Sequence, residues 1–439
     1  MMDRDQAIEF LKKTGDLVKA DGWCVSLGGS RSVRTRFANN GIRQSESGAD
    51  EVLRVAAYDG KRSGETSTND LSDSGAAAAV RTALDLMKAG AEDPEYVGPP
   101  PAAEVPAVEA AFESVEKFSA DDGAAMAGAA IKAFRGAGVT GAGAVEAETS
   151  SKAMLSNLGF AAFHKGTLIS FSASARSEKG GAGWAGRASN QAETVKAGAL
   201  AATAAEKAVS SGAPKPLVPG DYTVVLEPQA TAELLAFVLF MLDARSADEG
   251  RSFFSKKKGG NRAGEKIFAP GLTVNSDAQS VVFLGRPFDD EGVVQAKTPW
   301  IDKGVLSNLY YTRFWAKKSG RKPTARPENV LMKGGGALLE DIVKATDRGI
   351  LVTRFWYTNI TDPRTLSVTG VTRDGTFFIS GGKLSNAVAN MRFNVSIPEV
   401  LSQIDMMSGP QRVPAMGGTI ACPSVRVKEF RFTSVSEAI

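Results

Sequence analysis

Two proline-rich stretches constrain the organisation of this chain more than any other feature of its sequence. They are PEYVGPPPAAEVP at residues 94–106 and SGAPKPLVPGDY at 211–222. Clusters of proline and glycine interrupt helices and sheets, and they mark the boundaries of folded segments. A chain of 439 residues is expected to hold two or three domains. We therefore predict an N-terminal segment at 1–93, a middle segment at 107–212 and a C-terminal domain at 220–439.

The N-terminal and middle segments share one pattern, which is a helix, then antiparallel strands, then a second helix. In the first segment, a helix at 3–20 precedes an alternating run that contains Asn39-Asn40-Gly41, a sequence that tolerates the positive φ angles of a hairpin turn. In the second segment, an alanine-rich helix at 121–138 precedes strands, with turns expected at Asn157-Leu158-Gly159 and at His164-Lys165-Gly166. The pattern predicts two α+β segments of similar architecture.

The C-terminal domain is predicted to consist mainly of antiparallel strands. Aromatic and β-branched residues dominate the runs DYTVVLEP, SVVFLGRPFDD, GVLSNLYYTRFWA, GILVTRFWYTN, LSVTGVTRDGTFFISGGKLSNAV and SVRVKEFRFTS. Asp374-Gly375 is typical of a hairpin turn. Helices are expected at 229–243 and in ALLEDIVKATDRG. The predicted fold class is α+β, with an N-terminal α+β region of two helix and antiparallel-strand segments followed by an antiparallel β-rich C-terminal domain.

Charge and hydropathy argue against nucleic acids and membranes as direct partners. The chain has 52 basic and 49 acidic residues and a net charge of +3, which gives no electrostatic case for binding a phosphate backbone. The N-terminus lacks the apolar region of a signal peptide. The most apolar run, ELLAFVLFML at 233–242, is much shorter than the roughly 20 residues that cross a bilayer. Cys24 and Cys422 lie far apart and indicate no disulfide framework. We expect a cytoplasmic protein.

The single histidine, His164, limits the enzyme chemistry open to the chain. Zinc hydrolase sites usually use two or more histidines, and a Ser-His-Asp triad would need His164 as its base. The sequence contains no HExxH, CxxC or GxSxG motif. A histidine without a chemical role, in a strand or a turn, is the simpler interpretation.

Two short clusters remain as candidates for binding chemistry. Asp289-Asp290-Glu291 places three carboxylates together, as a hard-cation or acid–base site would require. Lys333-Gly334-Gly335-Gly336 precedes a predicted helix, whose backbone N–H groups could hold a carboxylate or a phosphate. The Walker motif GxxxxGK[ST] is absent. For each cluster, a solvent-exposed turn is the alternative.

Several stretches, taken in order, resemble the TldD/PmbA family, whose members have been described as gyrase modulators and as peptide-trimming metalloproteases. They are DDEGVVQAKTPWIDKGVLSNLYYTRFWAKKSGRKPTARPEN, NVLMKGGGALLEDIVKATDRGILVT and FFISGGKLSNAVANMRFNVSIPEVL, together with TRFANNGIRQ and SNLGF nearer the N-terminus. The resemblance covers nearly the whole chain. It implies an α+β N-terminal region, a β-rich C-terminal domain, and a dimer that commonly consists of two related subunits.

The resemblance also implies where a catalytic metal would lie. One subunit of the family carries HExxxH on the first helix of the C-terminal domain, where two histidines and a cysteine bind zinc and the glutamate acts as general base. Aligned on Leu234-Leu235, the histidine and glutamate positions fall on Ala236, Phe237 and Met241. None of these can bind zinc or activate water as the family requires. Cys422 aligns better with the terminal strand than with the zinc cysteine, so we predict no metal and no catalytic residue in this chain.

The resulting hypothesis is a non-catalytic, PmbA/TldE-like subunit that pairs with a histidine-bearing TldD-like subunit and completes a peptide channel. Zinc is expected only in that partner. Candidates to line the channel are the acidic cluster Asp289, Asp290 and Glu291, the cation Arg313, and the loop Lys333, Gly334, Gly335 and Gly336. One alternative is a stand-alone homodimeric hydrolase that uses other chemistry. The second is a regulatory or binding protein of the gyrase-modulator type.

Overall fold

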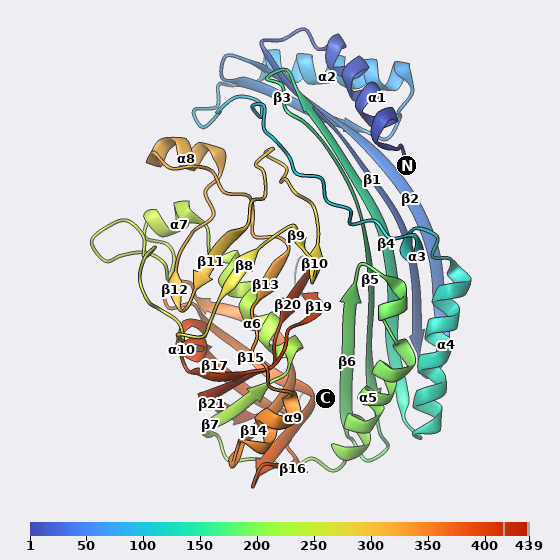
Figure 1. Ribbon diagram of the computed structural model, residues 1–439, viewed down its shortest axis with the longest axis vertical. Coiled ribbons are helices and arrows are strands. Elements are labelled where there is room, and N and C mark those ends of the chain that lie inside the picture. Colours follow the sequence, from blue (N-terminus) through green and yellow to red (C-terminus); the bar gives the residue numbers. More distant parts are fainter. Residues whose placement is uncertain (416–417, 437–439) are drawn as a thin grey trace.

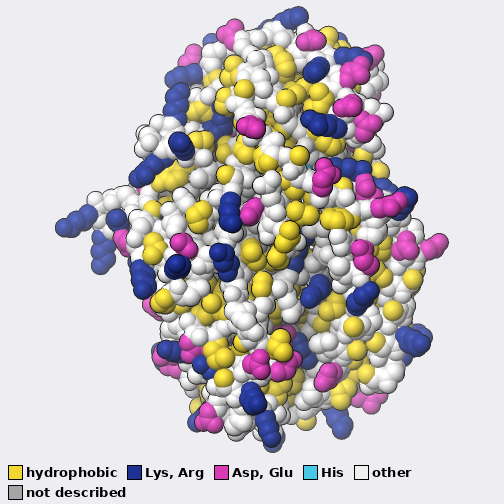
Figure 2. All heavy atoms as spheres, in the orientation of Figure 1, with side chains coloured by type: hydrophobic (Ala, Val, Ile, Leu, Met, Phe, Trp, Pro, Cys, Tyr) yellow, Lys and Arg dark blue, Asp and Glu magenta, His cyan; other side chains and the backbone are white. Residues whose placement is uncertain are grey.

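The computed structural model describes residues 1–415 and 418–436, and it consists of a long curved sheet beside a second, β-rich body (Figure 1). The curved sheet uses strands from the first half of the chain, and the second body uses the remainder. The predicted α+β class is confirmed. No helix of the described residues is long and apolar enough to cross a membrane. On the face shown in Figure 2, basic and acidic side chains intermix, in line with the balanced composition.

The curved sheet joins the N-terminal and middle segments through continuous backbone pairing. Its strand order is β3-β2-β1-β4-β5-β6, and every pairing is antiparallel. The strands are β1 (Gly22–Ala38), β2 (Gly41–Asp59), β3 (Arg62–Thr68), β4 (Thr140–Ser156), β5 (Ala161–Arg176) and β6 (Ala182–Ser189). The first segment supplies β1–β3, the middle segment supplies β4–β6, and the two meet where β1 pairs with β4. The two similar segments are therefore halves of one sheet.

Turns within this sheet test the sequence predictions directly. Asn39 and Asn40 have φ angles of 52° and 54° and connect β1 to β2, so the predicted hairpin is confirmed. The turn predicted at His164-Lys165-Gly166 is wrong, because these residues lie inside β5. There His164 is paired with Lys152 of β4. Pairing along the whole length of β4 keeps this segment extended despite its turn-like composition.

Four helices cover one face of the curved sheet in two pairs. They are α1 (Arg4–Leu17) and α2 (Asp73–Ala89) at one end, and α4 (Ala120–Gly136) and α5 (Ala197–Ser210) at the other. Alternate residues of β1 point to this face: Val25 and Leu27 pack under the first pair, and Val33 and Phe37 under the second. Short turns α3 (Glu113–Glu116) and η1 (Ala192–Thr194) lie in the connecting segments. The helices leave the opposite face free for the second body.

Each of the first three long helices begins at a side-chain cap that the sequence supplies. The side chains of Asp3, Ser72 and Ser119 accept hydrogen bonds from backbone N–H groups in the first turn. On the far face of the sheet, Met154 and Phe160 pack against Phe288 of the second body. The second body therefore docks on the face that the helices leave uncovered.

The second body contains a six-stranded sheet, a seven-stranded sheet and a short hairpin. The six-stranded sheet has the order β12-β11-β8-β13-β20-β19, and the hairpin pairs β9 with β10. Their bounds are β8 (Val274–Ser276), β9 (Gln279–Ser280), β10 (Phe283–Leu284), β11 (Thr298–Asp302), β12 (Val305–Leu306), β13 (Val330–Met332), β19 (Gln411–Ala415) and β20 (Gly418–Cys422). Most pairings are antiparallel, but β13–β20 and β14–β7 are parallel.

The seven-stranded sheet closes on itself, because β14 pairs with both β7 and β15 in the order β14-β7-β21-β17-β15. Its strands are β7 (Gly220–Leu226), β14 (Arg348–Asp362), β15 (Ser367–Ser380), β16 (Lys383–Ala387), β17 (Met391–Ser396), β18 (Ile404–Met407) and β21 (Val425–Val435). Phe355, Phe393 and Phe430 form a buried cluster of rings within it. The helices are α6 (Pro228–Phe240), α7 (Ala244–Asp248), α8 (Arg313–Ser319), α9 (Leu339–Lys344) and α10 (Ile397–Ser402).

Three local predictions for this body are wrong. The run SVVFLGRPFDD was expected as a strand, but the chain reverses at Val281-Val282, so that only Ser280, Phe283 and Leu284 of the run lie in the short strands β9 and β10. The run GVLSNLYYTRFWA was expected as a strand, but within it only β12 is extended, and helix α8 begins further along. The helix begins there because the Thr312 hydroxyl accepts a hydrogen bond from Trp315 N and caps its first turn. Asp374-Gly375 forms no hairpin. Both residues have positive φ (55° and 115°) at a bulge inside β15, and the chain turns instead at Gly381-Gly382.

Candidate functional site

Helix α6 presents apolar side chains at the positions where the family resemblance implies a metal. Phe237 and Met241 are 8% exposed, and Ala236 packs against the same core. Hydrocarbon side chains offer zinc no ligands, and the Met241 thioether is a poor one for this metal. Among the described residues, no group of three or more His, Cys, Asp or Glu side chains is arranged to hold a metal ion. The residues present at α6 do not fit zinc.

A half-buried acid, Glu233, lies in the middle of the same helix. The Glu233 carboxylate accepts hydrogen bonds from Phe355 N at 2.6 Å and from Gln229 Nε2 at 3.0 Å. Burial raises the pKa of Glu233 to about 7. Cys422 is fully buried, donates to Pro228 O at 3.0 Å, and has a pKa raised by burial. A buried thiol of this kind is unreactive, and it packs as a small apolar group.

Charged groups also join the curved sheet to the second body beside α6. Lys207 Nζ of α5 lies 2.6 Å from a carboxylate oxygen of Glu227, which precedes α6. Asp374, at the β15 bulge, lies 3.4 Å from Arg354 Nε and accepts a hydrogen bond from Ser174 of β5 at 3.2 Å. These contacts explain why β15 bulges at Asp374. The Lys207–Glu227 and Ser174–Asp374 contacts cross between the two bodies and fix their relative position.

The structure brings the acidic cluster and Arg313 together, and most of their polar atoms bind the protein itself. Asp289 accepts hydrogen bonds from the backbone N–H groups of Glu291 and Val293, both at 2.9 Å, while burial raises its pKa to about 6. Glu291 accepts from Arg313 N at 2.8 Å, at the first residue of α8. The Arg313 guanidinium donates to Gly98 O and Pro99 O, both at 2.8 Å. This arrangement anchors the first proline-rich stretch to the second body.

Asp290 and the glycine loop Lys333–Gly336 lie outside the arrangement formed by Asp289, Glu291 and Arg313. The Asp290 carboxylate is exposed and lies 2.9 Å from Arg286 Nη1 and 3.7 Å from Lys152 Nζ. The loop Lys333–Gly336 follows β13, and Gly335 N donates to Ser408 O at 2.9 Å. A side chain on Gly334 or Gly335 would collide with the backbone of Ser408 or Met407, which explains the glycines. No hydrogen bond or ion pair among the described residues joins the loop to the acidic cluster.

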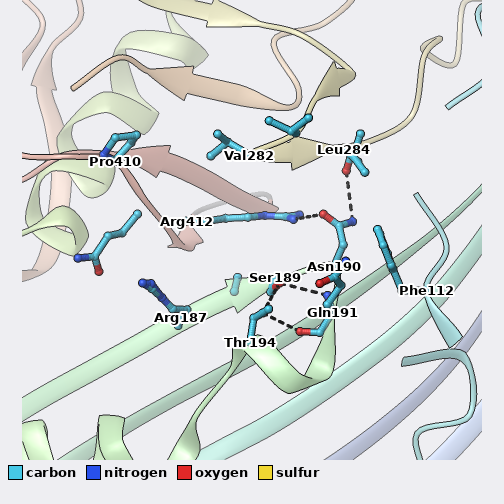
Figure 3. A pocket seen from close by; sticks show the side chains of 13 residues that line it. Phe112, Arg187, Ser189, Asn190, Gln191, Thr194, Val282, Leu284, Pro410 and Arg412 are labelled. Atoms are coloured by element: carbon cyan, nitrogen blue, oxygen red, sulfur yellow. Dashed lines mark hydrogen bonds between the residues drawn. The ribbon is translucent and has the colours of Figure 1, made fainter. Parts of the chain in front are cut away.

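A cleft runs between the edge of the curved sheet at β6 and the edge of the second body at β19. It consists of two adjoining pockets of about 320 and 280 Å³ that share Asn190, Leu284 and Arg412. The first pocket is shown in Figure 3. The second is lined by His164, Lys152 and Arg286, among others. We call these two pockets together the β6–β19 cleft.

His164 is a buried, neutral group in the wall of this cleft. Its side chain is almost fully buried, and burial, together with the nearby Arg286, lowers the pKa of the imidazole to about 4. At neutral pH the ring carries no charge. Sequence reasoning gave His164 no role, and it missed Asn190 and Arg412 altogether. No local pattern marks the last two, because they meet across 222 positions of sequence.

Comparison with known proteins agrees with this architecture. The model of the PmbA/TldA metallopeptidase central domain matches residues 101–211, and that of the PmbA/TldA metallopeptidase C-terminal domain matches residues 219–434. The chain belongs to the PmbA/TldD family. The resemblance inferred from the sequence motifs is therefore confirmed.

Individual relatives of this PmbA/TldD family member extend over almost its whole length. Metalloprotease PmbA of Escherichia coli is 23% identical, over 94% of this chain and 92% of its own. The crystal structure of TldE from Thermococcus kodakarensis superposes with a TM-score of 0.86 at 18% identity, over 98% of this chain and 99% of that one. A Thermotoga maritima structure, described as a candidate modulator of a DNA gyrase, gives a TM-score of 0.86 at 19% identity, over 97% of this chain and 99% of that one. At these identities, the two structures show a shared fold.

Proposed function

We propose that this chain is the non-catalytic subunit of a PmbA/TldD-type metalloprotease complex that processes peptides in the cytoplasm. The observation that carries the proposal is the set of buried or partly buried apolar side chains at Ala236, Phe237 and Met241 on α6. These side chains leave neither space nor ligands for the zinc ion that the family resemblance implies. The only histidine, His164, lies in the other sheet and supplies no substitute.

The names of relatives connect the chain with metalloproteases and with TldE. One relative of nearly the same length is named a metalloprotease, PmbA, and one structural neighbour is named TldE. We infer that a TldD-like subunit carrying HExxxH provides the zinc and the general base, while this chain provides part of the substrate channel. The zinc would then belong to the partner, and this chain would need no cofactor of its own.

The β6–β19 cleft is the part of this chain best suited to an extended peptide. Strand β6 is an edge strand of the curved sheet, and β19 is an edge strand of the six-stranded sheet. An extended peptide can add to such an edge through main-chain hydrogen bonds, while pockets beside the edge select its side chains. Asp290 and Lys333, whose side chains are exposed, remain candidates to face the partner or the peptide.

Isolation of the native complex tests the proposal. The tagged full-length chain would be recovered from its own cells under native conditions, and its partners and metals identified by mass spectrometry. A stoichiometric partner that carries HExxxH and about one zinc ion per pair is the expected result. A metal-free homodimer without such a partner would overturn it. Cleavage of peptides by the purified homodimer, abolished by substitutions in this chain, would favour a stand-alone hydrolase.

A further inference from the structure

A buried cation without an anionic partner lies at the centre of the β6–β19 cleft. Arg412 of β19 is 9% exposed. Its Nε donates to Thr419 Oγ1 at 2.8 Å, and its Nη1 donates to Asn190 Oδ1 at 2.6 Å. No described carboxylate forms an ion pair with it, and burial alone lowers the pKa of Arg412 to about 10. The guanidinium is therefore charged at neutral pH, and it is held by neutral groups only.

The protein fixes this guanidinium in place from several directions. Its central carbon lies 3.8 Å from the centroid of the Phe283 ring, which stacks against one face. Asn190 is itself held, because its Nδ2 donates to Thr167 O at 2.7 Å and to Leu284 O at 3.3 Å. Figure 3 shows the Arg412 side chain extended toward Asn190 across the pocket. A cation that is buried, oriented and unpaired is costly to maintain unless an anion completes the site.

A second arginine lines the same pocket. Arg187, from β6, is half-buried, and its guanidinium makes no hydrogen bond or ion pair with any described residue. By contrast, Arg286 in the adjoining pocket is neutralised by Asp290 at 2.9 Å and Glu328 at 3.5 Å. Among the described residues, the arginines of the cleft without a carboxylate partner are thus Arg412, which lines both pockets, and Arg187, which lines the first.

Apolar side chains border these two arginines. The tip of the β9–β10 hairpin, Val281 and Val282, lines the pocket with Phe112 and Pro410. Val281 is 93% exposed, so its side chain is available to cover a ligand. A ligand that fits this pocket should therefore carry a planar anionic group, which pairs with a guanidinium, and apolar atoms beside that group.

We propose that the first pocket of the β6–β19 cleft binds a carboxylate of an extended peptide at Arg412, beneath the Val281–Val282 hairpin tip, with Arg187 adding positive charge to the same pocket. The proposal rests on the proposed function, and it names the chemical feature of the peptide that this subunit recognises. A carboxylate matches the fork of N–H donors on a guanidinium, and a neighbouring peptide residue supplies the apolar contact. The carboxylate comes from the C-terminus of the peptide or from an acidic side chain.

Peptide binding to the purified full-length chain tests the assignment. The probes are fluorescein-labelled hexapeptides of alanine and valine with a free C-terminus, with a C-terminal amide, and with an amide plus one glutamate. Fluorescence anisotropy would give the dissociation constants. We expect at least one carboxylate-bearing peptide to bind about tenfold or more tightly than the neutral amide, with a preference that weakens as salt rises. The free C-terminus and glutamate probes identify which carboxylate is recognised.

Matched substitutions separate recognition from folding. Arg412→Gln and the half-buried Arg187→Gln should each reduce the preference for the carboxylate about tenfold, while binding of the neutral amide stays unchanged. Arg81→Gln removes the same charge from an exposed position on α2 and should change nothing. If Arg412→Gln fails to fold, Arg187→Gln still tests the site.

Three results would overturn the carboxylate assignment. They are equal affinity for charged and neutral peptides, an unchanged preference in a folded arginine variant, and a preference that does not weaken as salt rises. None of them depends on a partner subunit. A partner that co-purifies while these results are obtained would leave the subunit role standing and remove only the carboxylate pocket.

Discussion

The Glu233 carboxylate accepts a hydrogen bond of 2.6 Å from the backbone N–H of Phe355, and this bond ties α6 to β14. The helix that would carry a metal in a catalytic relative is fixed here by a half-buried acid and an apolar surface. Because burial raises the pKa of Glu233 to about 7, this contact changes its charge within the physiological pH range. The stability of the C-terminal domain should therefore depend on the protonation of this one residue.

Replacing Glu233 by glutamine should increase stability at high pH. The pKa is near 4.5 in the unfolded chain and about 7 in the folded protein, so wild-type stability from this group is complete below pH 4.5 and is lost as the pH rises through 7. Between pH 4.5 and 8, Glu233→Gln should gain about 3 kcal/mol relative to wild type. Urea unfolding at a series of pH values would measure this. Glu178→Gln, at an exposed position, is the control and should show no such trend.

The two phenylalanines of α6 provide a matched pair for the apolar face. Phe237 is 8% exposed and Phe240 is 73% exposed. Phe237→Ala should lower the free energy of unfolding by about 3–5 kcal/mol because it leaves a cavity in the core. Phe240→Ala, three residues further along the same helix, should change it by less than about 0.5 kcal/mol. Similar unfolding midpoints for the two variants would contradict the assignment of α6 as a core helix.

The single histidine can be followed directly by proton NMR. Because burial and Arg286 lower the pKa of His164 to about 4, its imidazole C–H signals should titrate near pH 4 in the folded protein and near 6.5 in urea. The folded state then loses stability from this group as the pH falls below about 6.5. At pH 5, His164→Gln should be about 2 kcal/mol more stable relative to wild type than at pH 8. A folded-state midpoint near 6.5 would show that the imidazole is solvated.

Arg313 should hold the first proline-rich stretch, residues 94–106, in its folded position. Removing its bonds to Gly98 O and Pro99 O with Arg313→Gln should free residues 94–106 locally, at a cost of about 1–2 kcal/mol. Cleavage after Glu104 by a glutamyl endopeptidase should then be roughly tenfold faster. Lys317→Gln, on the exposed side of the same helix, is the control. Unchanged cleavage would leave Arg313 free for the channel role suggested by the sequence.

Local sequence signals predicted those parts of the fold that local chemistry determines. Asn39 and Asn40 form the expected turn because both tolerate positive φ. Asp374-Gly375 has the same local chemistry, yet it forms a bulge, because Asp374 is positioned by Arg354 and by Ser174 of the distant β5. His164 stays in a strand because β4 pairs along the whole segment. In each failure, a long-range contact outweighed a local preference.

The candidate site was harder to predict than the fold for the same reason. The acidic cluster and Arg313 stood out as charged residues and do meet, but mainly to hold neighbouring segments in place. Arg187 and Arg412 lie in ordinary alternating strands, and nothing nearby distinguishes them from surface arginines. Only the approach of β6 to β19 turns them into a shared pocket. Only the folded structure shows that an arginine is buried without a carboxylate beside it.

The pairing of β1 with β4 has a practical consequence for anyone who trims this protein. The matched family regions begin at residue 101, but the register from Cys24↔Ser156 to Phe37↔Gly143 lies across that boundary. A fragment that begins at 101 would expose the unpaired backbone of β4 along that whole register, and a long bare strand edge recruits other chains. We expect such a fragment to aggregate when expressed. The unit that folds and stays monodisperse must therefore include the first strand.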